Sequence, residues 1–268
     1  MSLITSLKNS RIKDAVRLRE RRGREQQGRM IVDGARPLQR ALEAGVELDT
    51  IFFCQELAAS VEAMQVLAAA PTELLRVSES VFDRLAFGNM SDGLVGVARP
   101  PLAVLEQIQL SQQPLIVVLE GVEKPGNMGA VIRSADATGV EAVIITDGGT
   151  DIYNPNAIRA SQGAIFTLPV VLAESTDVLK WLQSHDVMIF AACIDGEATY
   201  TQCRFTQGTA FILGSEARGL TDRWHVEPVV SIRLPMHGMS DSLNVSTTAA
   251  VLLYEAVRQR SELSKSSQ

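Results

Sequence analysis

The sequence predicts an α/β protein of two domains, the larger of which is built on a mostly parallel sheet. A nearly continuous apolar run over 115–122 is typical of a strand buried on both faces of such a sheet. A Gly/Pro/Asn loop, a helical stretch and a second apolar run follow it, as in a strand–helix–strand unit. The chain of 268 residues is long enough to form two domains.

The N-terminal half alternates short apolar runs with helical patterns, which predicts a small α/β domain over residues 1–98. Its first helix is expected over 10–25, with Ser10 as the N-cap. Further helices are expected over 38–46 and 61–70, and strands over 50–54 and 93–98. Three prolines and a Gln/Ser stretch then interrupt the pattern. We therefore assign residues 99–113 to a linker.

The C-terminal half predicts five or six mostly parallel strands with helices on both faces of the sheet. The strands are expected over 115–122, 141–146, 166–171, 187–193, 209–214 and 229–235. The helices are expected around 128–138, 154–161, 176–184, 217–225 and 243–260. This domain is therefore expected to span 114–260, and the polar tail over 261–268 to be disordered.

Charge is distributed unevenly along the chain. The net charge is −6, yet residues 1–40 hold eleven Lys or Arg and four acids, so this segment carries +7 and the rest −13. Such asymmetry indicates a polyanionic partner. On a helix over 10–25, four of these cations would share one face, namely Lys13, Arg17, Arg21 and Arg24. They are candidates for contact with RNA phosphates, and a solvated helix surface is the alternative.

Several classes of protein are disfavoured by composition. No apolar run is long enough to span a membrane, and the N-terminus lacks the apolar core of a secretory signal. The chain has three widely spaced cysteines, Cys54, Cys193 and Cys203. An odd number at such spacing indicates reduced thiols. The spacing of the three histidines, His185, His225 and His237, matches no zinc-binding motif. We expect a cytoplasmic protein without a metal site.

Ligands of open parallel sheets bind beyond the carboxyl ends of the strands, and the loop after the first predicted strand is unusual. It reads EGVEKPGNMGAVIR over 120–133 and matches neither a P-loop nor a dinucleotide-binding fingerprint. Asn127 is placed to cap the following helix. Arg133 lies in an apolar stretch, so it needs an anionic partner or solvent; a surface arginine on the wet face of the helix is the alternative.

Two later loops also carry more polar residues than a simple turn needs. In the loop over 213–220, Gly214 and Gly219 bracket Glu216, and a strand-to-helix turn does not explain the carboxylate. The loop over 235–246 crowds hydroxyl and amide groups at the start of the last helix. One hydroxyl is expected to cap that helix, and the helix N-terminus suits an anionic group. The excess suggests a binding site.

Together these three loops resemble the motifs of the SpoU (TrmH-like) family of RNA ribose 2′-O-methyltransferases, within the SPOUT class. Asn-x-Gly-x-x-x-Arg occurs as Asn127 to Arg133, and Gly-x-Glu-x-x-Gly as Gly214 to Gly219. Pro-Met-x-Gly begins at Pro235, and Ser-Leu-Asn-Val-Ser follows from Ser242. The resemblance covers about residues 113–260, and the N-terminal half resembles the ribosomal-protein-L30e-like substrate-binding domain often attached in this family.

The resemblance implies a deep trefoil knot, a homodimer formed through the knotted domain, and S-adenosylmethionine as methyl donor. It implies cofactor contacts from Gly214, Leu234, Met236 and Leu243. It makes Arg133 the catalytic candidate, with Asn127, Glu216, Ser242 and Asn244 shaping the site. Ribosomal RNA is favoured over transfer RNA as substrate. Methylation of an RNA base, and RNA binding without catalysis, are two less favoured functions.

Overall fold

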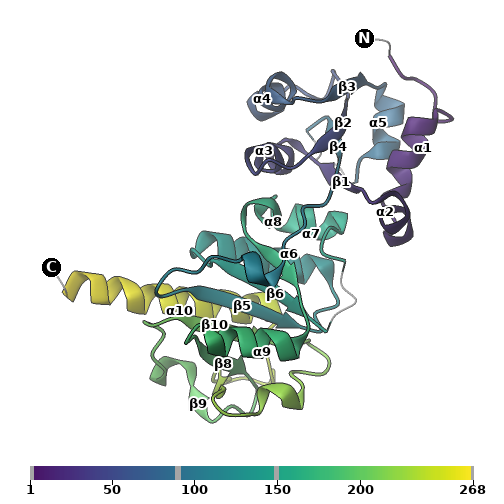
Figure 1. The fold of residues 1–268 in the computed structure, drawn as a ribbon. Helices are drawn as coiled ribbons and strands as arrows, with labels where there is room; N and C mark the ends of the chain where they lie inside the picture. Colours follow the sequence, from purple (N-terminus) through teal and green to yellow (C-terminus); the bar gives the residue numbers. More distant parts are fainter. Residues whose placement is uncertain (1–2, 88–91, 148–150, 267–268) are drawn as a thin grey trace. The chain divides into compact units, whose positions relative to one another are not determined.

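The computed structural model describes residues 3–87, 92–147 and 151–266, which form two compact units (Figure 1). The first unit comprises the described residues up to Leu102 together with Asp151–Thr167. The second comprises the remainder, from Ala103 onward. The segment Asp151–Thr167 lies within the sequence range expected for the C-terminal domain, yet it packs within the first unit. The domain boundaries over 1–98 and 114–260 stay a prediction about the sequence.

The first unit contains a mixed four-stranded sheet in the order β1-β4-β2-β3. Its strands are β1 (Met30–Asp33), β2 (Leu48–Phe53), β3 (Glu73–Arg76) and β4 (Leu94–Ala98). Its helices are α1 (Ser10–Arg17), α2 (Arg21–Gln27), α3 (Ala35–Glu43), α4 (Val61–Ala69), α5 (Glu79–Leu85), α7 (Pro155–Ala160) and α8 (Ala164–Thr167). Strand β4 runs antiparallel to both β1 and β2, whereas β2 and β3 are parallel. One apolar core joins residues of α1 and α5 to those of the sheet.

The helix predicted over 10–25 is in fact two helices, α1 and α2. The amide of Leu18 bonds back to Ala15, and the Leu18 side chain is fully buried. A Cβ at Gly23 would lie 1.9 Å from the carbonyl oxygen of Arg17, so α2 packs directly against the end of α1. The N-cap of α1 is Asn9, whose side chain accepts a hydrogen bond from the Arg11 amide, and not Ser10.

The second unit is built on a seven-stranded sheet in the order β7-β6-β5-β10-β8-β11-β9, and every neighbouring pair is parallel. The strands are β5 (Leu115–Glu120), β6 (Ala142–Thr146), β7 (Val170–Leu172), β8 (Met188–Ala192), β9 (Ala198–Thr199), β10 (Thr209–Leu213) and β11 (Val230–Arg233). All residues of β5 and β10 are buried, which confirms the prediction of a parallel sheet covered on both faces. The short β9 is one strand more than expected.

The helical segments of the second unit flank this sheet. They are η1 (Leu105–Gln107), α6 (Pro125–Ala137), α9 (Ser175–Ser184), η2 (Tyr200–Gln202), η3 (Asp222–Trp224) and α10 (Val245–Ser266). The last of them, α10, packs against α6 and β10 (Figure 1). In the part of the chain that the structure describes, no helix is long and apolar enough to cross a membrane.

Three expected elements differ from the observed ones. The helix expected around 217–225 is a loop that contains only η3, because this segment folds back onto a buried carboxylate at the end of β5. The strand expected over 166–171 begins only at Val170, after α8 and Pro169. Helix α10 continues to Ser266, six residues beyond its expected end. Of the tail expected to be disordered, residues 267–268 lie outside the described residues.

Candidate functional site

A cavity of about 290 Å³ opens at the carboxyl ends of three neighbouring strands, β10, β8 and β11. Because parallel strands end at the same edge of a sheet, their following loops converge there. The cavity is lined by Ala192–Asp195 after β8, by Gly214–Glu216 and Arg218–Leu220 after β10, and by Leu234 and Met236 after β11. The start of α10 and the residues before it complete the wall.

All four residues assigned to cofactor binding line this cavity: Gly214, Leu234, Met236 and Leu243. Glu216 and Ser242 line it as well. Sequence reasoning missed the loop after β8, with Ile194 and Asp195, and it missed His225. The strand 187–193 was predicted, so the rule that ligands bind at strand ends could have identified its loop.

Gly214 is required by the fold of its own loop. A Cβ there would lie 2.3 Å from the carbonyl carbon and oxygen of Gly219. The loop closes through a hydrogen bond of 2.9 Å from the amide of Gly219 to the carbonyl oxygen of Ser215. Gly219 itself has φ +66°, a conformation that favours glycine. The spacing of the two glycines is thus explained by a tight turn that places Glu216 at the cavity.

Glu216 is the centre of a polar cluster that joins three distant parts of the chain. Its Oε1 accepts hydrogen bonds from Nδ2 of Asn127 at 2.8 Å and from Nδ2 of Asn244 at 2.6 Å. Its Oε2 accepts one from Nζ of Lys124 at 2.7 Å. The structure therefore brings together three predicted residues and adds Lys124. Lys124 could have been identified from its position just before Pro125, where the helix that carries Asn127 begins.

Asn244 has two roles at once. Its Oδ1 accepts a hydrogen bond of 2.9 Å from the amide of Ser246, so it caps α10, while its Nδ2 binds Glu216. The expectation that a hydroxyl caps this helix is therefore wrong. Asn127 was also expected to be a cap, but α6 begins after Lys124, and Asn127 lies within its first turn. Its amide is thereby free to bind Glu216.

Electrostatics keep Glu216 ionised. The Lys124 ammonium, first through its hydrogen bond and then through its charge, holds the pKa of Glu216 below its ordinary value. The same contact raises the pKa of Lys124. A carboxylate with a lowered pKa is a weak proton acceptor. Glu216 is therefore suited to orient the amides of Asn127 and Asn244, and not to act as a general base.

A second carboxylate, Glu120 at the end of β5, fixes the loop that follows Gly219. It is 2% exposed and accepts hydrogen bonds from the Thr221 amide at 2.7 Å, the Thr221 hydroxyl at 2.9 Å and Trp224 Nε1 at 2.8 Å. Burial of a carboxylate is tolerated only when donors satisfy it. These donors tie η3 to the central strand and so hold one wall of the cavity.

Arg133 is not part of this cluster. It is exposed on α6, and it has no hydrogen bond or ion pair with any residue that the structure describes. It follows Asn127 by six residues, about one and two-thirds helical turns, so the two side chains leave α6 on different sides. In a single chain, Arg133 therefore lies where the alternative interpretation placed it, on the solvent face of the helix.

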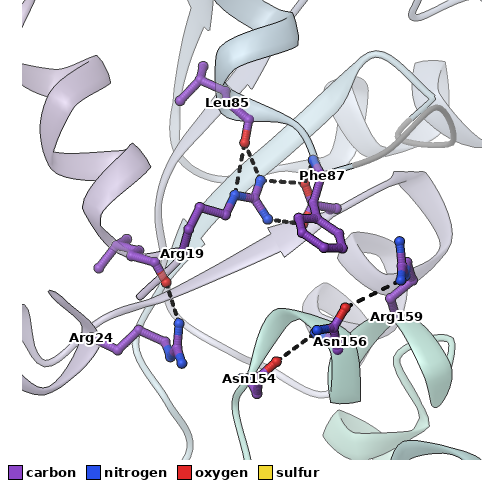
Figure 2. Close-up of polar contacts among 9 residues, drawn as sticks. Arg19, Arg24, Leu85, Phe87, Asn154, Asn156 and Arg159 are labelled. Carbon is purple, nitrogen blue, oxygen red and sulfur yellow. Dashed lines mark hydrogen bonds and ion pairs between the residues drawn. The ribbon is translucent and has the colours of Figure 1, made fainter. Parts of the chain in front are cut away.

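The four cations predicted to share one RNA-binding face do not do so. Lys13, Arg17 and Arg21 are exposed, and Arg21 Nε bonds to Glu25 at 2.7 Å. Arg24, however, is only 6% exposed. It pairs with Asp151. It also donates from Nη1 to the carbonyl oxygen of Leu18 at 2.6 Å, the bond drawn from Arg24 in Figure 2. Because α1 ends before Arg21, helical spacing does not extend from Lys13 to Arg24.

No group of three or more His, Cys, Asp or Glu that could hold a metal ion occurs among the described residues. Three aspartate or glutamate side chains line the cavity separately, namely Asp195, Glu216 and Asp241. Among the described residues of the lining, only Arg218 contributes a permanent positive charge. Because Lys124 pairs with Glu216, Asp195 and Asp241 are the two carboxylates that offset the charge of Arg218 in the lining.

Comparison with known proteins gives consistent matches over both halves of the chain. The model of the SpoU rRNA Methylase family matches residues 114–254, and that of the MRM3-like substrate binding domain matches residues 9–96. The chain is 31% identical, over 250 residues, to a 23S rRNA (uridine(2479)-2′-O)-methyltransferase of Streptomyces viridochromogenes. That alignment covers 91% of this chain and 87% of the relative.

Two crystal structures are similar over nearly the whole chain. One, of an RNA 2′-O ribose methyltransferase, has a TM-score of 0.86 at 43% identity and covers 97% of this chain and 99% of that one. The other is the SpoU methyltransferase AviRb from Streptomyces viridochromogenes in complex with the cofactor AdoMet. It has a TM-score of 0.86 at 30% identity and covers 94% of this chain and 98% of that one.

Proposed function

The chain belongs to the SpoU rRNA Methylase family, and from this premise we propose that it methylates a ribose 2′-hydroxyl of 23S ribosomal RNA, with S-adenosylmethionine as methyl donor. The observation that carries the proposal is the cavity at the ends of β10, β8 and β11, with the Glu216 cluster beside it. The relative named above and others are 23S rRNA 2′-O-methyltransferases.

The cavity suits S-adenosylmethionine by its charge. When bound, this cofactor supplies an electrophilic methyl group on a positively charged sulfur. With Glu216 paired to Lys124, Asp195 and Asp241 outnumber Arg218 and leave the lining the negative charge that attracts such a ligand. We propose that Gly214, Leu234, Met236 and Leu243 hold the cofactor. The missing side chain of Gly214 lets the turn close against Gly219, which keeps Gly214 in the cavity lining.

We propose that Arg133 is the catalytic residue, supported by Asn127, Glu216, Ser242 and Asn244. A ribose hydroxyl is a weak nucleophile near neutral pH, so the charge that develops on its oxygen must be stabilised. Arginine remains protonated in proteins, so Arg133 would stabilise this oxygen or bind a neighbouring phosphate and would not remove the proton. Ionised Glu216 would orient the two asparagine amides, and Ser242 would contribute its hydroxyl to the cavity wall.

The position of Arg133 supports a homodimer in which each site is completed by the partner. In a single chain Arg133 is exposed and does not line the cavity. We propose that the knotted domains pair and that Arg133 of one chain reaches the cavity of the other. Co-expression of Arg133→Ala with Gly214→Val tests this, because a mixed dimer then has one intact site. Random pairing should restore about a quarter of wild-type activity, whereas sites complete within one chain would restore none.

The trefoil knot also stays a proposal. The observation that supports it is that α10, which follows β11 in the chain, packs against α6 and β10, the latter two strands away from β11 in the sheet. Stretching the denatured chain from both ends in an optical trap tests it. A knotted chain should stop short of the contour length of 268 residues, and full extension would exclude the knot.

The substrate is tested by mapping 2′-O-methyl groups in total RNA with and without the gene, followed by methylation of unmodified 23S rRNA transcript by the purified protein. We expect one alkali-resistant linkage in 23S rRNA to depend on the protein. A dependent site in transfer RNA would favour that substrate instead. An alkali-labile methylated nucleotide would indicate methylation of a base. Cofactor binding without transfer to any RNA would favour an RNA-binding protein without catalysis.

A further inference from the structure

Phe87 forms an exposed aromatic contact in the first unit that the proposed reaction does not use. Its side chain follows α5 and is 43% exposed. The guanidinium carbon of Arg159, on α7, lies 4.9 Å from the ring centroid, and that of Arg19 lies at 5.9 Å. Figure 2 shows Phe87 between these two arginines. Because Arg159 is exposed, the face of its guanidinium that is turned away from the ring can stack on a further flat group.

Buried polar contacts fix the ring from one side. Arg19 pairs with Asp33 through two hydrogen bonds, NH1 to Oδ2 at 2.5 Å and NH2 to Oδ1 at 2.6 Å. It also donates from Nε to the carbonyl oxygen of Leu85 at 3.0 Å (Figure 2). The amide of Phe87 donates to Oδ1 of Asp33 at 3.3 Å. These bonds hold the backbone from Leu85 to the amide of Phe87 in place before any ligand binds.

A second set of contacts fixes the helix that carries Arg159. The side chain of Asn154 caps α7 by accepting from the Asn156 amide at 2.9 Å, and Oδ1 of Asn156 accepts from NH2 of Arg159 at 3.3 Å (Figure 2). The buried pair of Arg24 and Asp151 anchors the start of this segment. Arg24, which was a candidate for RNA contact, and Arg19 thus support α7 and the ring.

The contact between Phe87 and Arg159 carries a positive charge that no neighbouring carboxylate among the described residues offsets. Asp33 and Asp151 are neutralised by their buried arginine partners. Arg159 is exposed and pairs with no carboxylate among the residues described. Arg36, also exposed, donates to Oε1 of Gln162 at 3.3 Å, on the same segment as Arg159. A ligand here would meet the guanidinium plane of Arg159, which is held over the Phe87 ring.

We propose that Arg159, supported by the Phe87 ring beneath it, forms a stacking platform for an unpaired nucleobase of the RNA substrate, and that Arg36, which bonds to Gln162 on the same segment, contacts a phosphate of that RNA. Proteins that recognise RNA stack unpaired bases on aromatic rings and on guanidinium planes. The platform combines both surfaces, and its buried support means that little ordering is needed on binding. It rests on the proposed function for its ligand, RNA, and adds a site in the substrate-binding unit.

The test compares substitutions that keep bulk or charge but remove the flat faces. Phe87→Leu and Arg159→Lys are each expected to weaken binding of unmodified 23S rRNA transcript about tenfold, the scale of one lost stacking contact. The KM for this RNA should rise by the same factor, with kcat at saturating RNA and the affinity for S-adenosylmethionine unchanged. Phe87→Trp should restore wild-type affinity, because it keeps an aromatic face.

Arg84→Lys is the matched control, since Arg84 is also exposed in this unit and contacts no aromatic ring among the described residues. It should leave RNA affinity unchanged. If Arg159→Ala weakens binding but Arg159→Lys does not, the arginine contacts only a phosphate and the platform is excluded. If the variants lower Tm but not RNA affinity, the contact is structural and the proposal is wrong. Failure of the wild type to bind or methylate the transcript overturns the proposed function instead.

Discussion

The basic N-terminal segment and the cavity of the second unit use their charged residues in opposite ways. In the first unit, Arg19 and Arg24 are largely buried against Asp33 and Asp151. In the second, Lys124 and Glu216 pair at the surface, with 72% and 32% of their side chains exposed. Part of the positive charge of the N-terminal segment is thus buried in ion pairs that stabilise the fold. The pair beside the cavity remains exposed to solvent. Charge density along a sequence counts cations but does not reveal their partners.

The largest effect should come from breaking a buried pair of the first unit. Arg24→Ala leaves the Asp151 carboxylate without its partner, which costs about 3 kcal/mol or more of unfolding free energy. Arg21→Ala, which removes an exposed pair with Glu25, should cost less than about 0.5 kcal/mol. Urea denaturation of both variants measures the difference. Equal losses would mean that burial does not distinguish these two arginines.

The next effect concerns Arg133, which belongs to the first motif but lies outside the Glu216 cluster. Arg133→Ala should reduce methyl transfer by at least about 10²-fold, the scale of one catalytic group. Cofactor binding should be retained, because Arg133 does not line the cavity. Single-turnover methylation of the RNA and calorimetric titration of S-adenosylmethionine separate the two quantities. A fully active variant would remove Arg133 from the catalytic role.

The exposed cations of the first unit should act on RNA affinity and on its salt dependence. If Lys13, Arg17 and Arg21 each meet a phosphate, replacing all three by Ala should flatten the slope of log K against log[salt] by about 2 to 3 units. Replacing the buried Arg24 as well should leave the slope of log K against log[salt] unchanged. Filter binding over a salt series gives the slopes. An unchanged slope in the triple variant would assign these side chains to a solvated surface.

A smaller effect is expected from pH at the Glu216 cluster. The pKa of Glu216 is lowered in the folded protein, so its pair with Lys124 is present above the ordinary value of 4.5 and is lost as the pH falls through the lowered pKa. Cofactor affinity should therefore fall at the acid end of a titration from pH 7 to about 3.5. Glu216→Gln, which cannot ionise, should bind about tenfold more weakly at pH 7 and show no such fall. Parallel acid dependence in both proteins would place the titrating group elsewhere.

The smallest effect is a difference in reactivity between two thiols. Burial raises the pKa of Cys193 and of Cys203, so both should react slowly with iodoacetamide at neutral pH. Of these two, Cys193 alone lines the cavity, so saturating S-adenosylmethionine should slow its alkylation further and leave Cys203 unaffected. Peptide mass spectrometry over a time course measures both rates. Equal protection of the two thiols would indicate a general tightening of the protein and not occupation of the cavity.

Much of the second unit could be predicted because its signals are local. Continuous apolar runs locate buried strands, and polar loops after them locate the ligand edge. Three of the four residues in the Glu216 cluster were found in this way. The prediction was less successful where non-local contacts decide the conformation. The loop after Gly219 has helical composition, but it folds onto Glu120, which precedes Thr221 by 101 residues.

By itself the sequence determined the α/β class, the parallel sheet of the second unit and the loops that meet at its carboxyl edge. Apolar periodicity and glycine spacing are properties of neighbouring residues, and they constrain the backbone wherever those residues lie. Only the tertiary structure decided that Arg24 is buried, because its partner Asp151 lies 127 residues away. It also decided that Asp151–Thr167 packs within the first unit, since burial depends on which distant surfaces meet. For the same reason it brought Lys124 to Glu216 and placed Arg159 over Phe87.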